Sequence, residues 1–402
     1  MNIPKLRFKE FTDEWVYYKY KDIFNLNQGL QIPITERFLD YAPNRFFYIT
    51  NEFLKPSSKK SYYIENPSPN VICTKEDILM TRTGNTGKVI TNIAGVFHNN
   101  FFRIKYNPKN FNKDFICCIL NQNKIQNKIL TLAGSSTIPD LNHKDFYSIK
   151  SRFPKLKEQE KIAKFINTVD KKIENIENTI SSLENQKKGL LQQIFSQKLR
   201  FKDKNGNNYP DWEKKKLGDI TQSQGGTALE KYTTTNGLYK FISIGNYSTY
   251  STYLDNGIRI DLNNKTKKQL LNKNDLVMIL NDKTSSGNII GRTLLIDKDN
   301  TYIYNQRSQR LICNTKIIIP SFLYFLLNSD FRKNIIKKVQ GATQIYINYS
   351  TIEVMHLNIP CLEEQTKIAD FLSAFDRKLE NQKAQLEHWQ QIKKGLLQQM
   401  FV

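Results

Sequence analysis

Two polar loops carry the side-chain types that proteins use to contact nucleic acids. The first loop, residues 81–88 (TRTGNTGK), combines small residues, which let a backbone approach a phosphate or a groove, with the candidate contacts Arg82, Thr83, Asn85 and Lys88. The second loop, residues 281–292, offers on the same logic Lys283, Ser285, Ser286, Asn288 and Arg292. Cations hold phosphates, whereas amides and hydroxyls can bond base edges. From the sequence alone, an ordinary solvated hairpin explains the first loop equally well.

Motifs for catalysis are missing. The segment GNTGK at residues 84–88 lacks the spacing of a phosphate-binding loop, and no G-x-G-x-x-G follows a strand. An amino-methyltransferase would be expected to carry [DN]-P-P-[YF], which NPSP at residues 66–69 does not supply. The crowded carboxylates of PDWE at residues 210–213 do not suit a metal nuclease, and the four histidines have no metal-ligand spacing. We therefore predict no catalytic residue, no metal site and no cofactor bound by this chain.

The composition indicates a globular protein with a polyanionic partner. The 402 residues suit two or three domains, 39% are hydrophobic, and the formal net charge is +22. Most of the excess positive charge lies in residues 1–150 and 201–355. The five cysteines form no C-x-x-C pair, so we interpret them as small core residues. Because the sequence has neither a long apolar run nor an apolar signal core, we expect a cytoplasmic protein.

The chain contains an internal duplication with an offset of 206 residues. KKGLLQQIF ends at Phe195, and KKGLLQQMF ends at Phe401. Between residues 158–195 and 364–401, eighteen of thirty-eight positions are identical. Weaker matches upstream, such as LRF at residues 6–8 and 199–201, keep the same order. Each half is therefore a variable domain followed by a repeated tail.

Both tails have the apolar spacing of long amphipathic helices. Steps of three and four predict a pairing seam at Ile166, Val169, Ile173, Ile176, Ile180, Leu183, Lys187, Leu190 and Ile194. The second tail has at the same phases Leu372, Phe375, Leu379, Gln382, Leu386, Trp389, Lys393, Leu396 and Met400. Each seam thus contains one lysine. Gly189 and Gly395 lie inside these helices, and either tolerated drift or the close approach of another backbone would explain them.

The variable parts have short β-branched runs broken by polar turns, together with helical stretches, so we predict α+β domains. The predicted boundaries are 1–153 for the first domain, 154–197 for its helix, 198–359 for the second domain and 360–402 for its helix.

The tandem order of domain and helix, with the markers PKLKEQEKIAKFI, PCLEEQTKIADFL and the paired KKGLLQQ[IM]F, resembles the specificity (S) subunit of type I restriction-modification systems. The resemblance spans essentially the whole chain. It implies two target recognition domains with mixed β-sheet and helices, separated by two long helices that form an antiparallel coiled coil. Each domain would recognise one half of a split double-stranded DNA target, and the helices would set the gap.

The resemblance also implies partners. Two modification (M) subunits would bring S-adenosylmethionine and methylate adenine N6, and two restriction (R) subunits would bring ATP with Mg. Helix residues outside the seam are candidates for docking partners, with simple solvation as the alternative: Lys161, Lys172, Gln192, Lys367, Lys378 and Gln398. A free-standing duplicated DNA-binding protein or regulator is the alternative function, and a self-contained methyltransferase or nuclease is disfavoured by the missing motifs.

Overall fold

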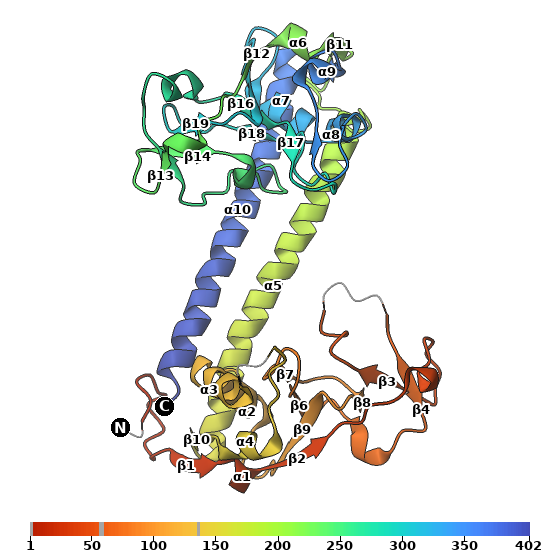
Figure 1. The fold of residues 1–402 in the computed structure, drawn as a ribbon, viewed down its shortest axis with the longest axis vertical. Helices are drawn as coiled ribbons and strands as arrows, with labels where there is room; N and C mark the ends of the chain where they lie inside the picture. Colours follow the sequence, from red (N-terminus) through yellow and green to blue (C-terminus); the bar gives the residue numbers. More distant parts are fainter. Residues whose placement is uncertain (1–2, 56–59, 135–136) are drawn as a thin grey trace. The chain divides into compact units, whose positions relative to one another are not determined.

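The chain forms two units in a computed structural model that describes residues 3–55, 60–134 and 137–402. Unit 1 comprises the chain up to Glu177 together with Ala384–Val402, and unit 2 comprises Asn178–Lys383. The two long helices, α5 (Leu156–Phe195) and α10 (Leu362–Gln399), each contribute one end to each unit (Figure 1). The helices fall inside the predicted segments 154–197 and 360–402, whereas the compact units cut across both of them.

Unit 1 consists of two four-stranded sheets, a two-stranded ribbon and short helices. In chain order its elements are β1 (Val16–Lys19), α1 (Tyr20–Ile23), β2 (Phe24–Gln28), β3 (Arg45–Ile49), β4 (Tyr63–Glu65), β5 (Ile72–Cys73), β6 (Ile78–Thr81), β7 (Val89–Ile90), β8 (Gly95–Phe97), β9 (Phe101–Tyr106), α2 (Lys113–Leu120), α3 (Asn123–Ala133), α4 (His143–Ser148) and β10 (Lys150–Phe153). One sheet has the order β2-β9-β6-β7 and is antiparallel. The other, β4-β3-β8-β5, is mixed, because β3 and β8 are parallel. The sheet that contains β3 and β4 lies farther from α5 than α2 and α3 do (Figure 1).

Unit 2 repeats most of this topology, with an additional two-stranded sheet of β17 and β21. Its elements are β11 (Glu213–Lys216), α6 (Leu217–Ile220), β12 (Thr221–Gly225), β13 (Thr233–Thr234), β14 (Tyr239–Ile242), β15 (Arg259–Ile260), β16 (Leu276–Ile279), β17 (Asn281–Asp282), β18 (Thr293–Leu295), β19 (Tyr302–Tyr304), β20 (Ser308–Cys313), α7 (Pro320–Leu327), α8 (Phe331–Ile336), β21 (Ile345–Tyr346), α9 (Tyr349–Glu353) and β22 (His356–Ile359). The sheet β12-β20-β16-β18 corresponds to β2-β9-β6-β7, and the parallel pair β14–β19 corresponds to β3–β8. The duplication seen in the sequence is therefore a duplication of fold.

Strand alternation divides the core of each unit in two. In β6, Ile78 and Met80 belong to the cluster that also holds the helices, whereas Leu79 belongs to a cluster with the second sheet. In β16, Met278 packs with the helices and Val277 packs on the other side. Every residue of these two strands is buried. The central sheet therefore holds the outer sheet on one face and the helices on the other.

The two long helices pack antiparallel within each unit. In unit 1 the seam Lys393 lies 2.6 Å from Asp170, and in unit 2 the seam Lys187 pairs with Asp376. None of the apolar seam positions predicted from the sequence is exposed. The predicted fold class, two α+β domains with mixed sheets and a pair of antiparallel long helices, is confirmed.

A buried ionic cluster ties the start of each long helix to its own domain. Glu158, 2% exposed, accepts hydrogen bonds at 2.7 Å from Arg7 Nε and Nη2, and one at 3.2 Å from Trp15 Nε1. Glu364 is held in the same way by Arg200 at 2.8 Å and by Trp212 at 3.1 Å. The glutamine that follows each glutamate adds to this attachment, because the side chains of Gln159 and Gln365 form hydrogen bonds with backbone atoms of the preceding loops. The repeated Glu-Gln thus fixes where each helix leaves its domain.

The two helix glycines are not sites of close approach by any backbone that the structure describes. A Cβ atom added to Gly189 or to Gly395 would meet nothing within 4 Å, apart from the helix's own backbone. The close-approach explanation is therefore wrong for contacts with residues 3–55, 60–134 and 137–402.

Candidate nucleic-acid interface

The first predicted loop joins β6 to β7 and is turned by backbone in the left-handed region. Gly84, Asn85 and Gly87 have φ of 60°, 54° and 87°. The buried Thr81 holds the loop closed, because its Oγ1 donates to Asn85 O at 2.5 Å and accepts from Lys88 N at 2.9 Å. The side chains of Asn85 and Lys88 are exposed.

Arg82 and Thr83 are engaged within unit 1. Arg82 forms a two-point ion pair with Asp140, with Nε–Oδ1 2.9 Å and Nη2–Oδ2 2.6 Å. Thr83 Oγ1 donates to Asn100 Oδ1 at 2.9 Å. These two side chains shape the loop, so Asn85 and Lys88 are the candidates that present free surface there.

Side chains from two neighbouring segments hold this loop in place by hydrogen bonds. Gln126 of α3 donates from Nε2 to Gly87 O at 2.9 Å and to Leu120 O at 2.7 Å. Asn51 Nδ2 donates to Thr83 O at 2.8 Å. A loop held by α3 and by the turn that follows β3 keeps its exposed side chains in place, which favours specific recognition over loose contact.

The second predicted loop joins β16 to β18 in unit 2 and has a similar support. Asp282 accepts hydrogen bonds from Thr284 N at 3.1 Å and from Ile289 N at 2.9 Å. From α8, Arg332 donates to Gly287 O, and at 2.9 Å to Ile290 O. Burial and then the neighbouring Arg292 lower the pKa of Arg332 to about 10. Arg332 therefore takes the place that Gln126 has in unit 1.

The exposed part of the second loop carries four of the five predicted residues, Lys283, Ser285, Ser286 and Asn288. The fifth, Arg292, is half-buried, and burial lowers its pKa. It donates to Asn288 O at 2.8 Å and to Ser251 Oγ at 3.1 Å. Each predicted set thus lies in one loop, and the two loops lie at equivalent ends of the two central sheets. Within the sets, Arg82 and Arg292 hold the loops in shape.

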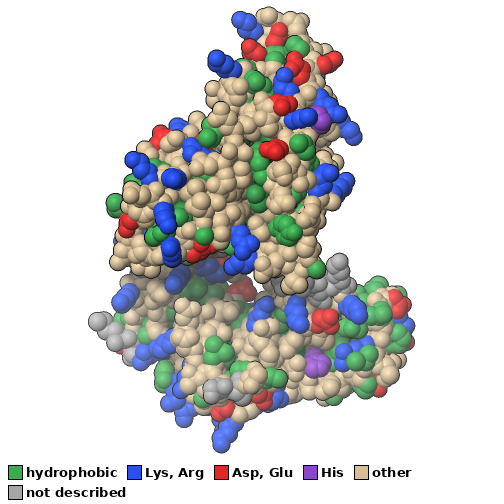
Figure 2. Space-filling view, turned by 45° about the horizontal axis from the view of Figure 1, so that its top comes forward, with side chains coloured by type: hydrophobic (Ala, Val, Ile, Leu, Met, Phe, Trp, Pro, Cys, Tyr) green, Lys and Arg blue, Asp and Glu red, His purple; other side chains and the backbone are tan. Residues whose placement is uncertain are grey.

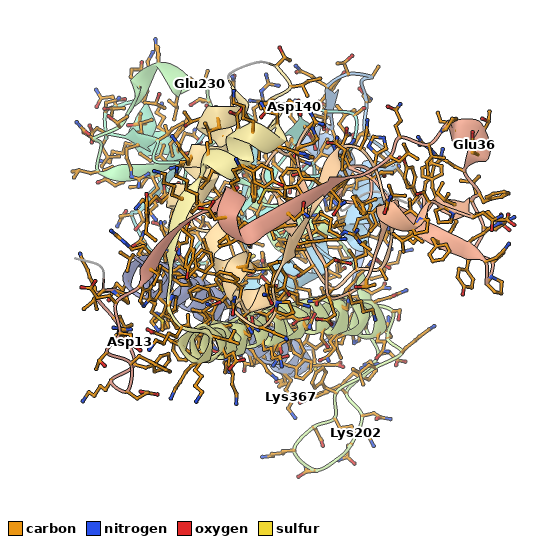
Figure 3. The ribbon with its side chains drawn as sticks, turned by 90° about the horizontal axis from the view of Figure 1, so that it is seen from below. Asp13, Glu36, Asp140, Lys202, Glu230 and Lys367 are labelled. Atoms are coloured by element: carbon orange, nitrogen blue, oxygen red, sulfur yellow. The ribbon has the colours of Figure 1, made fainter. Side chains whose placement is uncertain are left out.

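A second segment, which the sequence analysis did not single out, borders each loop. Asp140 forms a β-bridge with Thr83 in unit 1, and β21 pairs with β17 in unit 2. Figure 3 labels Asp140. Tyr346 of β21 is 42% exposed beside the second loop. The glycines that precede these segments, Gly134 and Gly341, recur at matching places in the two halves and were the available sequence signal.

The six docking candidates on the helices divide into two kinds. Lys161 pairs with Glu10 and lies over the ring of Phe8. Its counterpart Lys367 donates to Lys202 O at 2.6 Å, and both residues are labelled in Figure 3. These two lysines hold the loops that precede the domains, whereas the other candidates are exposed on the helix surface: Lys172, Gln192, Lys378 and Gln398.

Neither a metal centre nor a membrane span is found in the described parts of the chain. Across residues 3–55, 60–134 and 137–402, no group of three or more His, Cys, Asp or Glu is placed to hold a metal ion. Over the same residues, no helix has the length and apolar character needed to cross a bilayer.

The positive charge is spread over the face of the molecule drawn in Figure 2. Figure 2 shows lysine and arginine side chains scattered across the visible face rather than gathered in one patch. Such a distribution suits contacts with a long phosphate backbone at several points.

Comparisons with known proteins agree on one family. The model of the type I restriction modification DNA specificity domain matches residues 12–185 and 209–388. The chain is 25% identical to the type I restriction enzyme MjaVIII specificity subunit of Methanocaldococcus jannaschii, over 98% of this chain and 94% of that protein. It is 30% identical over 139 residues to the HindI specificity subunit of Haemophilus influenzae, covering 34% of this chain and 29% of that protein.

Solved structures share the fold. The crystal structure of the type I restriction-modification S subunit from M. genitalium superposes with a TM-score of 0.64 at 16% identity, covering 100% of this chain and 99% of that one. A chain from a structure that describes assembly and conformational transition of the type I system superposes with a TM-score of 0.55 at 12% identity, covering 96% and 97%.

Proposed function

Because the chain belongs to the type I restriction-modification specificity subunits, with two recognition domains in tandem, we propose that each domain recognises one half of a bipartite double-stranded DNA target. The observation that carries this proposal is the pair of loops at residues 81–88 and 281–292. They occupy equivalent positions on duplicated folds but carry different side chains. Loops with equivalent positions in the fold but different exposed side chains suit two half-sites of different sequence.

The long helices are proposed to set the gap between half-sites and to dock the methyltransferase subunits. Helices of 40 and 38 residues pair along an apolar seam and also pack against the domain cores. The helix positions that stay exposed are available to partners. The exposed residues Lys172, Gln192, Lys378 and Gln398 recur at matching phases of the two helices. Two-fold repetition of these positions supports docking of two copies of one partner.

The chain itself is proposed to be non-catalytic and cytoplasmic. In the complex, two M subunits would use S-adenosylmethionine to methylate adenine N6, and two R subunits would use ATP with Mg. What this chain supplies is target recognition and the placement of the two half-sites.

A methylation assay tests the proposal. The purified chain, a type I methyltransferase subunit, and both together are incubated with DNA and labelled S-adenosylmethionine. We expect label in DNA only when both proteins are present, at adenines within one bipartite motif. Methylation by this chain alone would overturn the non-catalytic assignment. Sites that are unchanged when the chain is omitted would favour the alternative of a free-standing DNA-binding regulator.

A further inference from the structure

Two four-residue β-turns lie beside the predicted loops and were not singled out from the sequence. Residues 98–101 (HNNF) join β8 to β9, and residues 305–308 (NQRS) join β19 to β20. Both turns are closed by the same hydrogen bond. Phe101 N donates to His98 O at 2.9 Å, and Ser308 N donates to Asn305 O at 3.1 Å.

The backbone of each turn is fixed to the neighbouring loop in the same way. Arg82 N donates to Asn100 O at 2.7 Å in unit 1, and Leu280 N donates to Arg307 O at 2.9 Å in unit 2. The turns thus accept hydrogen bonds from the first residue after β6 and from the first residue after β16.

Glycine packs against the first residue of each turn. A Cβ atom at Gly29 would lie 2.2 Å from His98 O, and one at Gly226 would lie 2.0 Å from Asn305 O. Because a Cβ atom cannot fit at such distances, only glycine lets the backbone at the end of the preceding strand contact the turn directly. Three independent backbone features therefore place the two turns identically in their units.

The central side chains of the two turns differ, although the backbones match. In unit 2, Glu230 accepts from Asn305 Nδ2 at 2.7 Å and from Gln306 Nε2 at 3.3 Å (Glu230 is labelled in Figure 3). Arg307 is exposed, and no described residue forms a hydrogen bond or ion pair with its guanidinium. A fixed backbone with a free, exposed arginine is suited to the two-point recognition of a guanine edge.

In unit 1 the same positions carry amides. Asn99 Oδ1 is buried and has no hydrogen-bond partner among the described residues, and Asn100 Oδ1 accepts from Thr83 Oγ1. An amide oxygen has two lone pairs, so Asn100 Oδ1 can accept a second bond while its Nδ2 donates. That donor and acceptor pair matches adenine N7 and N6.

We propose that these turns are base-recognition elements: Arg307 contacts a guanine in the half-site of unit 2, and Asn100 contacts an adenine in the half-site of unit 1. The proposal rests on the DNA recognition proposed above and adds specific residues to it. The two domains would then differ in specificity partly because equivalent turns carry different side chains.

The test uses the full chain, co-expressed with its methyltransferase subunit, and maps methylated adenines across the host genome. The parent map defines both half-sites. We expect Arg307→Ala to lower the preference at one base pair of the unit 2 half-site by roughly tenfold to a hundredfold, the size of one two-point base contact. The unit 1 half-site should stay unchanged. Arg307→Lys should keep part of the preference, because lysine can also bond guanine.

Two further variants separate recognition from general effects. Lys298→Ala removes an exposed cation of the same unit away from the turn, and should leave the motif intact. The double variant Asn99→Gln with Asn100→Arg places the unit 2 side chains on the unit 1 turn, and should alter the unit 1 half-site alone.

Several outcomes would overturn the proposal. An unchanged motif with Arg307→Ala would show that the turn contacts no base. Equal weakening of methylation at every sequence would indicate a phosphate contact instead. A parent complex without any bipartite motif would overturn the proposed function itself, so the two failures are distinguishable.

Discussion

Lys393 Nζ lies 2.6 Å from Asp170 Oδ1 on the opposite helix of unit 1, and the duplicated pair Lys187 and Asp376 meets in the same way in unit 2. Each lysine occupies a seam position at which the heptad pattern alone would place an apolar residue. Each aspartate lies on the helix opposite its lysine, and Asp170 and Asp376 occupy equivalent positions of the two repeated helices. One polar pair per seam therefore favours a single antiparallel register.

We expect this pair to contribute modestly to stability. Both side chains of the unit 1 pair are more than a third exposed, so solvent and salt screen the attraction. A double-mutant cycle with Lys393→Ala and Asp170→Ala should give a coupling free energy below about 1 kcal/mol that shrinks in high salt. Urea unfolding at two salt concentrations measures it. Coupling that is insensitive to salt would contradict this account.

The buried Glu158 cluster should matter far more. Glu158→Gln leaves Arg7, whose side chain is 9% exposed, without its counter-charge, so we expect a loss of about 3 kcal/mol or more in the free energy of unfolding. Glu160→Gln, at an exposed position of the same helix, is the matched control and should change little. Adding Arg7→Met to Glu158→Gln should recover part of the loss, because no charge is then left buried. A double variant less stable than Glu158→Gln would argue against an unpaired arginine as the cause.

Gly189 and Gly395 should be replaceable in the isolated chain. Since no described residue outside the helix's own backbone lies within 4 Å of an added Cβ, alanine should stabilise each helix by roughly 0.5–1 kcal/mol. Thermal unfolding of the chain without partners tests this expectation. If assembly with the methyltransferase subunit weakens in the same variants, the glycines serve the partner's approach; unaffected assembly would leave tolerated drift as the explanation.

The partly buried thiols of Cys117 and Cys118 should resist alkylation. Burial raises the pKa of Cys117 and of Cys118 to about 12, compared with about 8.5 for an exposed thiol. A raised pKa favours the neutral thiol in the folded state, so its contribution to stability is present below about pH 8.5 and is lost as the pH rises toward 12. At pH 9, iodoacetamide should modify both cysteines much more slowly in the native chain than in urea, as followed by mass spectrometry. Equal rates would show that the fold does not shield these thiols.

The exposed lysines of the two predicted loops should act on phosphates. Lys88→Ala and Lys283→Ala should each weaken DNA binding uniformly across sequences and reduce the slope of log K against log salt by about one. Asn85→Ala and Asn288→Ala should leave that slope unchanged and alter sequence preference. Fluorescence anisotropy over a salt series, with target and non-target duplexes, separates these effects. A lysine variant with an unchanged slope would remove that residue from the phosphate contacts.

The sequence by itself determined the duplication, the two long helices and the residues of their seam, because all three depend on periodicity and repetition along the chain. It also placed the polar loops at residues 81–88 and 281–292, since Gly, Asn and Ser between β-branched runs mark turns locally. Only the tertiary structure decided what each polar group does. Arg82 meets Asp140 from 58 positions away, and Glu158 meets Arg7 from 151 positions away.

The last residues of the two KKGLLQQ[IM]F segments also show that the sequence does not specify which surfaces meet. Phe195 packs against Phe322 in unit 2, with ring centroids 5.7 Å apart, while Phe401 stacks on Phe115 in unit 1 at 5.3 Å. Each copy therefore completes the core of the unit whose variable domain does not immediately precede it in sequence. An apolar pattern specifies which face of a helix is buried, but it does not specify the partner. That choice depends on the shape and register of surfaces brought together by the whole fold.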